Sequence, residues 1–174
     1  MPMSSPRLIY RAPTRHDLPR LFAIYSDPQT QLFNPSGPMT EEAQANALLE
    51  RWIGHWEIHG YGWWAIARRE EPEHIIGFGG IALHDFLGEQ RLNLGYRFAV
   101  EAWGQGFATE VGRTALEHGF SSLNLDEVYG FVRPANVASI RVLEKIGMQR
   151  CGDLDDVPGQ APSLLFKTVV APSP

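Results

Sequence analysis

Residues 103–110, WGQGFATE, decide how this chain is interpreted. The stretch follows a predicted strand and opens a predicted helix over Phe107–Phe120. Gly104 and Gly106 lack side chains, so a ligand can approach the backbone closely. The free N–H groups of the helix's first turn point to one region, where the helix dipole is positive. The turn therefore favours phosphate binding without a lysine, with a plain strand-to-helix turn as the alternative.

Two familiar phosphate-binding motifs do not fit this turn. A Walker A loop requires Gly-Lys-Ser/Thr, but Gly106 is followed by Phe107 and Ala108. A dinucleotide fingerprint requires a third glycine where this chain has Thr109. Asp126 has the right separation for that fold's acidic residue, but it precedes its strand, and repeated parallel βαβ units are absent. A nucleotide-binding domain is therefore a weaker hypothesis.

The half of the chain before the turn predicts helices and hairpins. Leu18, Leu21 and Tyr25 have helical spacing, and Thr40 is a good N-cap for a second helix that Gly60 closes. The other predicted segments are a strand at Leu8–Arg11, a loop at Gln29–Met39, and strands at Tyr61–Arg69, Ile75–His84 and Gln90–Val100. Short spacing between the last three strands favours antiparallel hairpins.

The sequence after the turn predicts one further strand and helix, followed by two final strands. A strand at Asp126–Val132 precedes a helix at Asn136–Ile146, with Asn136 as its N-cap and Gly147 just past its end. Final strands are predicted at Met148–Cys151 and Ser163–Val170. No repeat or linker interrupts residues 1–174, so we expect one α+β domain with a mixed sheet and a frayed segment at residues 1–7.

Composition narrows the class of protein. The chain has 174 residues, 44% hydrophobic and 20% charged, which is typical of one globular domain. A formal net charge of −5 disfavours nucleic acid as a partner. One cysteine, Cys151, excludes an intrachain disulfide, and no basic partner makes it a good nucleophile. No signal-peptide core or long apolar run is present, so we expect a cytoplasmic protein without a membrane partner.

Two motifs together carry a resemblance to a known family. WGQGFATE, followed further along by NVASIRVLEKIGM at Asn136–Met148, resembles the GNAT superfamily of acetyl-CoA-dependent N-acetyltransferases. The chain is most similar to the branch of ribosomal-protein-alanine N-acetyltransferases (RimJ/RimL-like), and the resemblance covers nearly its whole length. It implies a single GNAT-like domain with a twisted, mostly antiparallel sheet of about seven strands, a central splayed parallel pair and about four flanking helices.

The resemblance also implies where acetyl-CoA binds. Backbone donors of the loop would bind the pyrophosphate, and the preceding strand would pair its main chain with pantetheine, like an added β-strand. That strand would splay from Glu127–Val132 and admit the acyl chain. Trp103 stands where the family pattern has Gln or Arg, a departure common in this branch. The implied cofactor-binding residues of the loop and the strand are Phe98, Ala99, Val100, Gly104, Gln105, Gly106, Phe107, Ala108 and Thr109.

The second motif implies further contacts. Asn136 and Ser139 match the family's Asn-x-x-Ser/Ala positions and share one face at the helix start. Asn136 would contact the pantetheine arm, and it also serves as an N-cap. Leu143 stands where many members have a tyrosine that is thought to protonate the leaving thiolate. Ser139 is the nearest catalytic replacement by position, although a small packing residue there is the alternative.

The general base is not obvious. Family members often have a glutamate at the position of Asn93, which cannot take a proton but can orient a water or the acceptor amine. Substitutes are His84, Asp85, Glu89 and Tyr96, of which the first three fit a solvated hairpin turn better. An α-amine has a pKa near about 8 and lysine near about 10.4, so we hypothesise an acceptor already partly neutral, such as a protein N-terminus.

Other residue clusters have simpler interpretations. His55 and His59 have zinc-ligand spacing, but no further ligand is evident, so we expect a solvent-facing pair and no metal. Trp63 and Trp64 would point to opposite faces of a strand, one to the core and one to the acceptor cleft. The resemblance also makes residues 29–39 a candidate lid over that cleft. The acidic cluster at 153–156 is expected to be a solvated turn.

The leading hypothesis is therefore an enzyme that transfers acetyl from acetyl-CoA to a primary amine by direct attack. The acceptor is a protein N-terminus or a small amine such as an antibiotic or a polyamine. The alternative is a catalytically weak acyl-CoA-binding or sensing module, which the residues at positions 93 and 143 motivate. The sequence leaves the acceptor, the acyl-chain preference and the choice between monomer and homodimer open.

Overall fold

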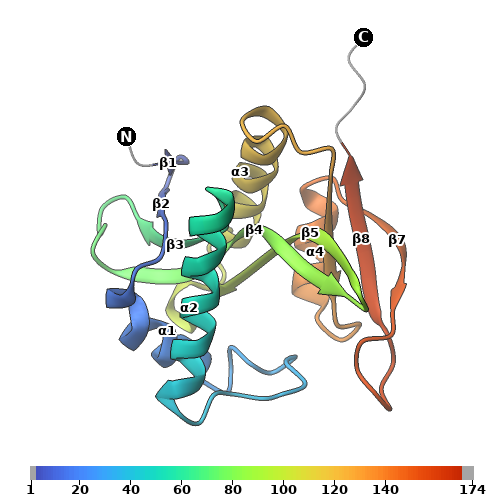
Figure 1. The fold of residues 1–174 in the computed structure, drawn as a ribbon, viewed down its shortest axis with the longest axis horizontal. Helices are drawn as coiled ribbons and strands as arrows, with labels where there is room; N and C mark the ends of the chain where they lie inside the picture. Colours follow the sequence, from blue (N-terminus) through green and yellow to red (C-terminus); the bar gives the residue numbers. More distant parts are fainter. Residues whose placement is uncertain (1–2, 170–174) are drawn as a thin grey trace.

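An eight-stranded sheet, in the order β1-β2-β3-β4-β5-β6-β8-β7, runs through the molecule. The computed structural model describes residues 3–169 (Figure 1). Its strands are β1 Met3–Ser4, β2 Leu8–Arg11, β3 Trp63–Arg68, β4 Ile75–Phe86, β5 Glu89–Phe98, β6 Glu127–Val132, β7 Gln149–Leu154 and β8 Ser163–Val169. All neighbours are antiparallel except β5 and β6. The predicted mixed, mostly antiparallel sheet with one parallel pair is confirmed.

The sheet has one strand more than the predicted seven, and this additional strand, β1, lies where the sequence predicts a frayed segment. Met3 pairs with Tyr10 and Ser4 with Ile9, so this part of the N-terminal segment is ordered as a short hairpin. Glu110 explains the difference, because it accepts hydrogen bonds from the Ser5 hydroxyl and holds the segment against a distant helix. Residues 1–2 of the predicted frayed segment, and residue 170 of the predicted last strand, lie outside the described residues.

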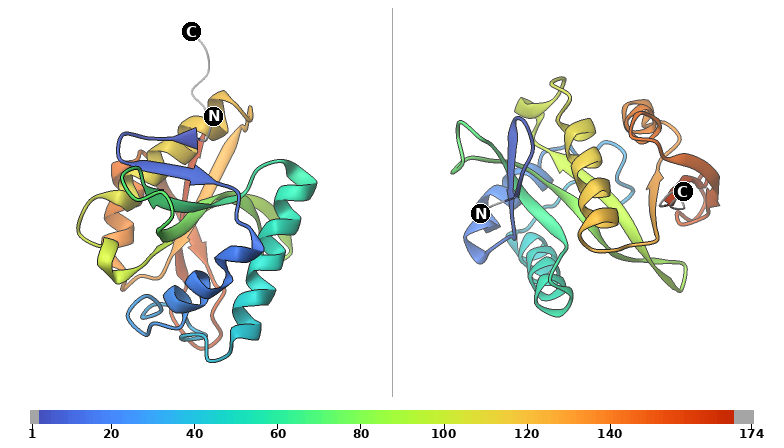
Figure 2. Two further views of the ribbon diagram at one scale, coloured as in Figure 1. Left: turned by 90° about the vertical axis from the view of Figure 1, so that its left-hand side faces the viewer. Right: turned by 90° about the horizontal axis from the view of Figure 1, so that it is seen from above.

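Four α-helices flank the sheet, two on each face (Figure 1 and Figure 2). They are α1 Leu18–Tyr25, α2 Glu42–His59, α3 Phe107–Ser121 and α4 Val137–Lys145, with short 3₁₀ turns at Arg15–Asp17 and Val100–Ala102. α1 and α2 cover one face, and α3 and α4 the other. None of the helices among residues 3–169 is both long and apolar enough to cross a bilayer.

Helix ends follow local capping chemistry. The Asn136 side chain accepts a hydrogen bond from the Ser139 N–H at 3.3 Å, so its predicted N-cap role is confirmed. Gly60 closes α2 in the left-handed conformation, also as predicted. Thr40 is not the N-cap of α2, because Glu41 occupies that position and completes a capping box with Gln44.

The sheet separates the two larger of the three buried clusters that form the core. Trp64 packs against Tyr10 at a ring distance of 4.8 Å, on the face that α3 covers. Trp63 faces the opposite side, where its ring lies 5.1 Å from that of Trp52 on α2. The predicted division of the two tryptophans between opposite faces is therefore confirmed, since alternate strand residues point to alternate faces.

The parallel pair opens almost at once. β5 and β6 are in register only at Asn93 and Tyr129, whereas β5 stays paired with β4 as far as Phe98. Beyond Asn93, one edge of β5 therefore has no neighbouring strand within residues 3–169. β5 ends two residues earlier than the sequence predicts, because the Ala99 N–H makes a last bond to Ile76 and a 3₁₀ turn begins at the next residue.

Candidate active site

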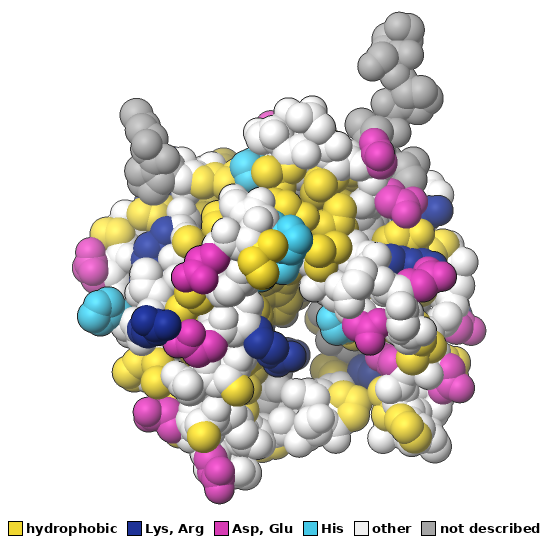
Figure 3. All heavy atoms as spheres, viewed as in Figure 1, with side chains coloured by type: hydrophobic (Ala, Val, Ile, Leu, Met, Phe, Trp, Pro, Cys, Tyr) yellow, Lys and Arg dark blue, Asp and Glu magenta, His cyan; other side chains and the backbone are white. Residues whose placement is uncertain are grey.

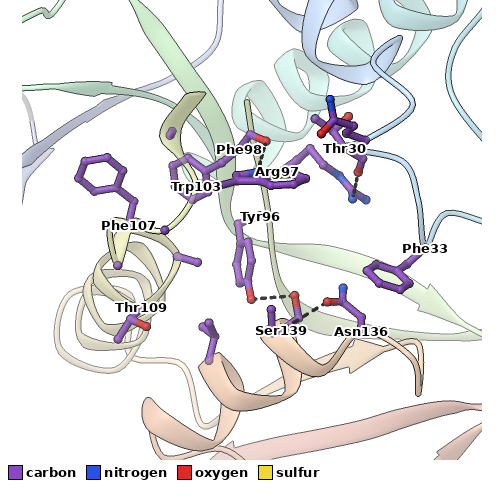
Figure 4. Close-up of a pocket in the computed structure, with 17 residues that line it drawn as sticks. Thr30, Phe33, Tyr96, Arg97, Phe98, Trp103, Phe107, Thr109, Asn136 and Ser139 are labelled. Atoms are coloured by element: carbon purple, nitrogen blue, oxygen red, sulfur yellow. Dashed lines mark hydrogen bonds between the residues drawn. The ribbon is translucent and has the colours of Figure 1, made fainter. Parts of the chain in front are cut away.

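Two cavities meet along the open edge of β5. The first, which we call the groove, holds about 470 Å³ between residues 29–33, β5, residues 102–109 and α4. The second, the inner cavity, holds about 320 Å³ between β3, β5, β6 and the loop at residues 154–163. Figure 3 shows the molecule hollowed between its N-terminal and C-terminal halves. The residues that line both cavities are Phe33, Tyr96, Arg97, Asn136 and Ser139 (Figure 4).

The Gly-rich turn forms one end of the groove. Gly104 and Gly106 have φ of +73° and +78°, a region that favours glycine. The space beside the Gly104 backbone is open, because a Cβ atom built there would have no other atom within 4 Å. Arg7 binds the Gln105 carbonyl at 2.6 Å from outside the groove. The first-turn N–H groups of α3 have no partner within the helix, which suits an anion such as a pyrophosphate.

The exposed edge of β5 offers main-chain groups to an extended ligand. Along an antiparallel strand, successive residues direct their N–H and C=O groups to opposite sides. Because the Ala99 N–H bonds Ile76 on β4, the main-chain groups of Tyr96 and Phe98 face away from β4. The Phe98 carbonyl accepts a bond from Trp103 Nε1 at 3.0 Å, which leaves the two N–H groups as donors.

The structure brings most of the sequence-predicted cofactor residues to the groove. Those that line it are Phe98, Gly104, Gly106, Phe107, Ala108, Thr109, Asn136 and Ser139. Ala99, Val100 and Gln105 do not line it. The Ala99 amide is used within the sheet, and the Gln105 side chain donates to the Glu101 carbonyl at 3.1 Å.

Asn93 lies at the wall of the inner cavity, where β5 and β6 separate. Its side chain is 8% exposed, and its carboxamide oxygen has no hydrogen-bond partner among the described residues. An unpartnered buried acceptor destabilises a fold, so a ligand N–H is a natural partner for it. Gly95 is the next residue on the same face of β5, and the Trp63 ring packs directly against its backbone because glycine has no side chain.

Tyr96 and Ser139 connect β5 to α4 between the two cavities. The phenol donates a hydrogen bond to the serine hydroxyl at 3.1 Å, as Figure 4 shows. Burial raises the pKa of Tyr96 above its ordinary value of 10.0, and the Ser139 bond and the Arg97 charge only partly offset that effect. A phenol in this state keeps its proton at neutral pH, so Tyr96 suits an acid better than the base that the sequence suggested.

Sequence reasoning missed Arg97 and Phe33. Arg97 donates to the Thr30 carbonyl, while its Nε is buried without a partner among the described residues. Phe33 lines both cavities, and Figure 4 shows its ring projecting from the loop toward the groove. The alternation of β5 places Arg97 on the same face as Asn93, which is the signal that was available for it. Nothing local in the sequence marks Phe33.

The far end of the inner cavity has mixed charge. Asp156 accepts a bond from the Ser163 hydroxyl at 2.8 Å and lies 3.8 Å from Arg133. His84 is exposed, as the sequence suggests, and one side of its ring stacks on Phe131 at 5.0 Å. Burial lowers the pKa of His84, against the influence of Asp85 and Asp156. Asp85 and Glu89 are exposed, as the sequence suggests.

Of the paired histidines of α2, His55 has structural contacts, whereas His59 faces solvent as predicted. His55 is half-buried, with Nδ1 2.8 Å from the Tyr61 carbonyl and Nε2 accepting from the Leu83 N–H at 3.1 Å. His59 is exposed and lies against the His55 ring. Within residues 3–169 no group of three or more metal-ligating side chains comes together.

Comparisons with known proteins agree with this geometry. The family described as "Acetyltransferase (GNAT) domain" matches residues 7–149. The N-acetyltransferase YoaA of Bacillus subtilis is 31% identical over 154 residues, which cover 87% of this chain and 85% of YoaA. A GNAT-family acetyltransferase from Bacillus anthracis has a TM-score of 0.79 at 24% identity, covering 97% of this chain and 98% of its own.

Another solved structure with a similar fold contains bound ligands. Spermidine N-acetyltransferase from Vibrio cholerae, solved with CoA and spermine, has a TM-score of 0.74 at 19% identity and covers 95% of this chain and 96% of its own. At that identity the likeness is one of fold. The family match extends from β2 through the Gly-rich turn and α4 to the start of β7, and so includes both motifs that line the groove. The chain therefore belongs to the GNAT family of acetyltransferases.

Proposed function

We propose that the chain transfers the acetyl group of acetyl-CoA to a primary amine by direct attack, without a metal. The observation that carries this proposal is the meeting of two cavities at the open edge of β5. The groove has an anion-binding turn at one end, and the inner cavity approaches the same edge from the other side. Two reactants can therefore meet without a covalent enzyme intermediate, and proximity supplies much of the rate.

The groove would hold acetyl-CoA, which supplies an activated acyl group. N–H groups from Gly104 to Thr109 would bind its pyrophosphate, and Tyr96 and Phe98 would pair their main chains with pantetheine. The same two N–H groups are the candidates to stabilise negative charge on the carbonyl oxygen. Asn136 would contact the pantetheine amides from α4. Ala99, Val100 and Gln105 would support this strand and turn from behind.

Asn93 would orient the amine at the end of the inner cavity. Its carboxamide oxygen has no hydrogen-bond partner among residues 3–169, and an amine N–H is a donor that could bond to it. Asparagine cannot remove a proton, so the enzyme would favour an amine that is already partly neutral. A protein α-amine, with a pKa near about 8, meets that condition better than a lysine side chain.

The charges of the inner cavity favour an N-terminus over a polyamine. Arg97 and Arg133 contribute two positive charges, whereas Asp156 contributes one negative charge. A polyamine's remaining ammonium groups would meet net positive charge in a partly desolvated site, at a cost in binding. We therefore propose a protein or peptide N-terminus as the acceptor, as in the ribosomal-protein acetyltransferase branch, in a cytoplasmic enzyme.

An acceptor comparison tests this proposal. The purified protein is incubated with acetyl-CoA and either a peptide with a free N-terminus, the same peptide with that N-terminus blocked, or spermidine. Mass spectrometry should show acetylation of the free peptide and none of the blocked one. We expect kcat/KM for spermidine to be lower by roughly tenfold or more. Preference for spermidine would contradict the choice of acceptor, and CoA binding without any transfer would favour a sensing module.

A further inference from the structure

Acetyl transfer from a thioester leaves a thiolate that needs a proton. Of the five residues that line both cavities, Phe33, Arg97 and Asn136 have no acidic proton to give near neutral pH. The other two, Tyr96 and Ser139, each have a hydroxyl. Leu143, one turn further along α4 from Ser139, is apolar and 4% exposed, so it has no proton to donate to the thiolate.

The geometry separates the two hydroxyls by role. The Tyr96 side chain spans the open edge from β5 to α4, and its phenol donates to Ser139 at 3.1 Å (Figure 4). Phe98, the next residue on the same face, has its ring 6.3 Å from that of Tyr96 and restricts where the phenol can swing. Ser139 therefore receives the bond and sets the position of the phenol.

The acidities favour the phenol as the donor. A phenol has a pKa of about 10, close to the value of about 8.5 for a thiol, whereas a serine hydroxyl is far less acidic. Few groups affect the phenol of Tyr96. Gly79 lies opposite it on β4, and Ser139 contacts it from α4. Arg97, the next residue of β5, is the charged group beside it. Burial outweighs Arg97 and Ser139 and raises the pKa of Tyr96, so the proton is present at neutral pH.

We propose that Tyr96 is the catalytic acid that protonates the departing sulfur, and that Ser139 is the residue that positions it. This inference rests on the proposed function. As the nitrogen–carbon bond forms and the carbon–sulfur bond breaks, Tyr96 gives its proton to the sulfur, which keeps the electron pair of the broken bond. The nitrogen gives up one proton, and Ser139 Oγ, which lines both cavities, relays it back to the phenolate. The products are an amide and a free thiol, and Tyr96 is restored.

Tyr96→Phe removes the acid while keeping the ring. We expect kcat to fall by roughly 10²–10⁴-fold while KM for acetyl-CoA stays nearly constant. The fall of kcat at alkaline pH that reports phenol ionisation should also disappear. Tyr61→Phe, which removes a phenol outside both cavities, is the matched control and should leave kcat unchanged. Ser139→Ala should lower kcat less than Tyr96→Phe does, and Ser139→Thr should restore part of the loss.

A binding measurement tests the same bond without turnover. If the phenol donates to sulfur, it stabilises the thiolate of bound CoA, so CoA affinity of the wild type should rise as pH passes through the thiol's titration. In Tyr96→Phe this rise should be lost, as calorimetry at several pH values would show. Unchanged kcat and an unchanged pH response in Tyr96→Phe would overturn the proposal. A wild type that shows the pH response but acetylates no amine would instead refute the proposed function.

Discussion

At the scale of single residues, Asn93 combines a structural cost with the role in acceptor binding that we propose. Its carboxamide oxygen is buried without a partner in the described chain, and natural proteins keep such groups chiefly at functional sites. The polar side chain therefore points to a ligand that completes its hydrogen bonding.

Asn93→Leu tests whether Asn93 lowers the stability of the fold but improves binding of the acceptor. Removing an unpartnered buried polar group should raise the free energy of unfolding by about 1 kcal/mol, because no hydrogen bond is lost. The same change should raise KM for the acceptor and lower kcat/KM, while KM for acetyl-CoA stays nearly constant. Urea unfolding and steady-state kinetics measure the two effects. A less stable variant with normal acceptor kinetics would show that Asn93 has only a structural role.

Gly95 is the second residue whose identity the site dictates. A Cβ at this position would lie 2.3 Å from Cζ2 of Trp63, which is itself held against Trp52. Gly95→Ala should therefore displace the indole, lower stability by about 1–3 kcal/mol and raise the acceptor KM. Gly54→Ala is a suitable control, because a Cβ there meets nothing within 4 Å. An unaltered acceptor KM in Gly95→Ala would argue against Trp63 as part of the acceptor site.

At the scale of elements, one carboxylate fastens the N-terminal hairpin to α3. Glu110 accepts hydrogen bonds from Ser5 Oγ at 2.7 Å and from the Arg7 N–H and Nε at 2.8 and 2.7 Å. Burial alone would raise the pKa of Glu110, but these bonds outweigh it and hold the pKa below its ordinary value of 4.5. Because Arg7 also binds the Gln105 carbonyl, this fastening steadies the Gly-rich turn.

The sign of this pKa shift gives a pH-dependent prediction. A lowered pKa in the folded state contributes stability that is complete above pH 4.5 and is lost as pH falls through the folded-state value. Glu110→Gln should therefore lower the free energy of unfolding by about 1–3 kcal/mol at neutral pH. The difference from the wild type should shrink below pH 4.5 in urea unfolding series. Glu117→Gln, a change at an exposed residue of the same helix, is the control and should leave the free energy of unfolding at neutral pH nearly unchanged.

At the scale of the whole molecule, the groove joins elements from both halves of the chain, so its ligand should stabilise the entire fold. A ligand present at about 100 times its dissociation constant adds about 2.7 kcal/mol, which raises Tm by roughly 5–10 °C in a domain of this size. We expect acetyl-CoA and CoA to do so, and NAD and ATP not to, in parallel thermal unfolding. Stabilisation by a nucleotide alone would refute the assignment of the groove.

Much of this fold could be predicted because its signals are local. Capping at Asn136, the left-handed Gly60 and the Gly-rich turn each depend on a few neighbouring residues, and the structure places all three as predicted. The mixed sheet followed from strand spacing and from the resemblance. The errors have tertiary causes: β1 is ordered by a distant glutamate, and β5 ends where the bonds to β4 end.

The sequence by itself determined the fold class, the family and the conformation of the Gly-rich turn, since these depend on motifs contiguous in the chain. Only the tertiary structure decided which side chains share a cavity. Tyr96 and Ser139 are 43 residues apart, and their contact depends on how far β5 diverges from β6 and on how α4 packs against the sheet. Long-range packing sets those distances, and no local pattern records them.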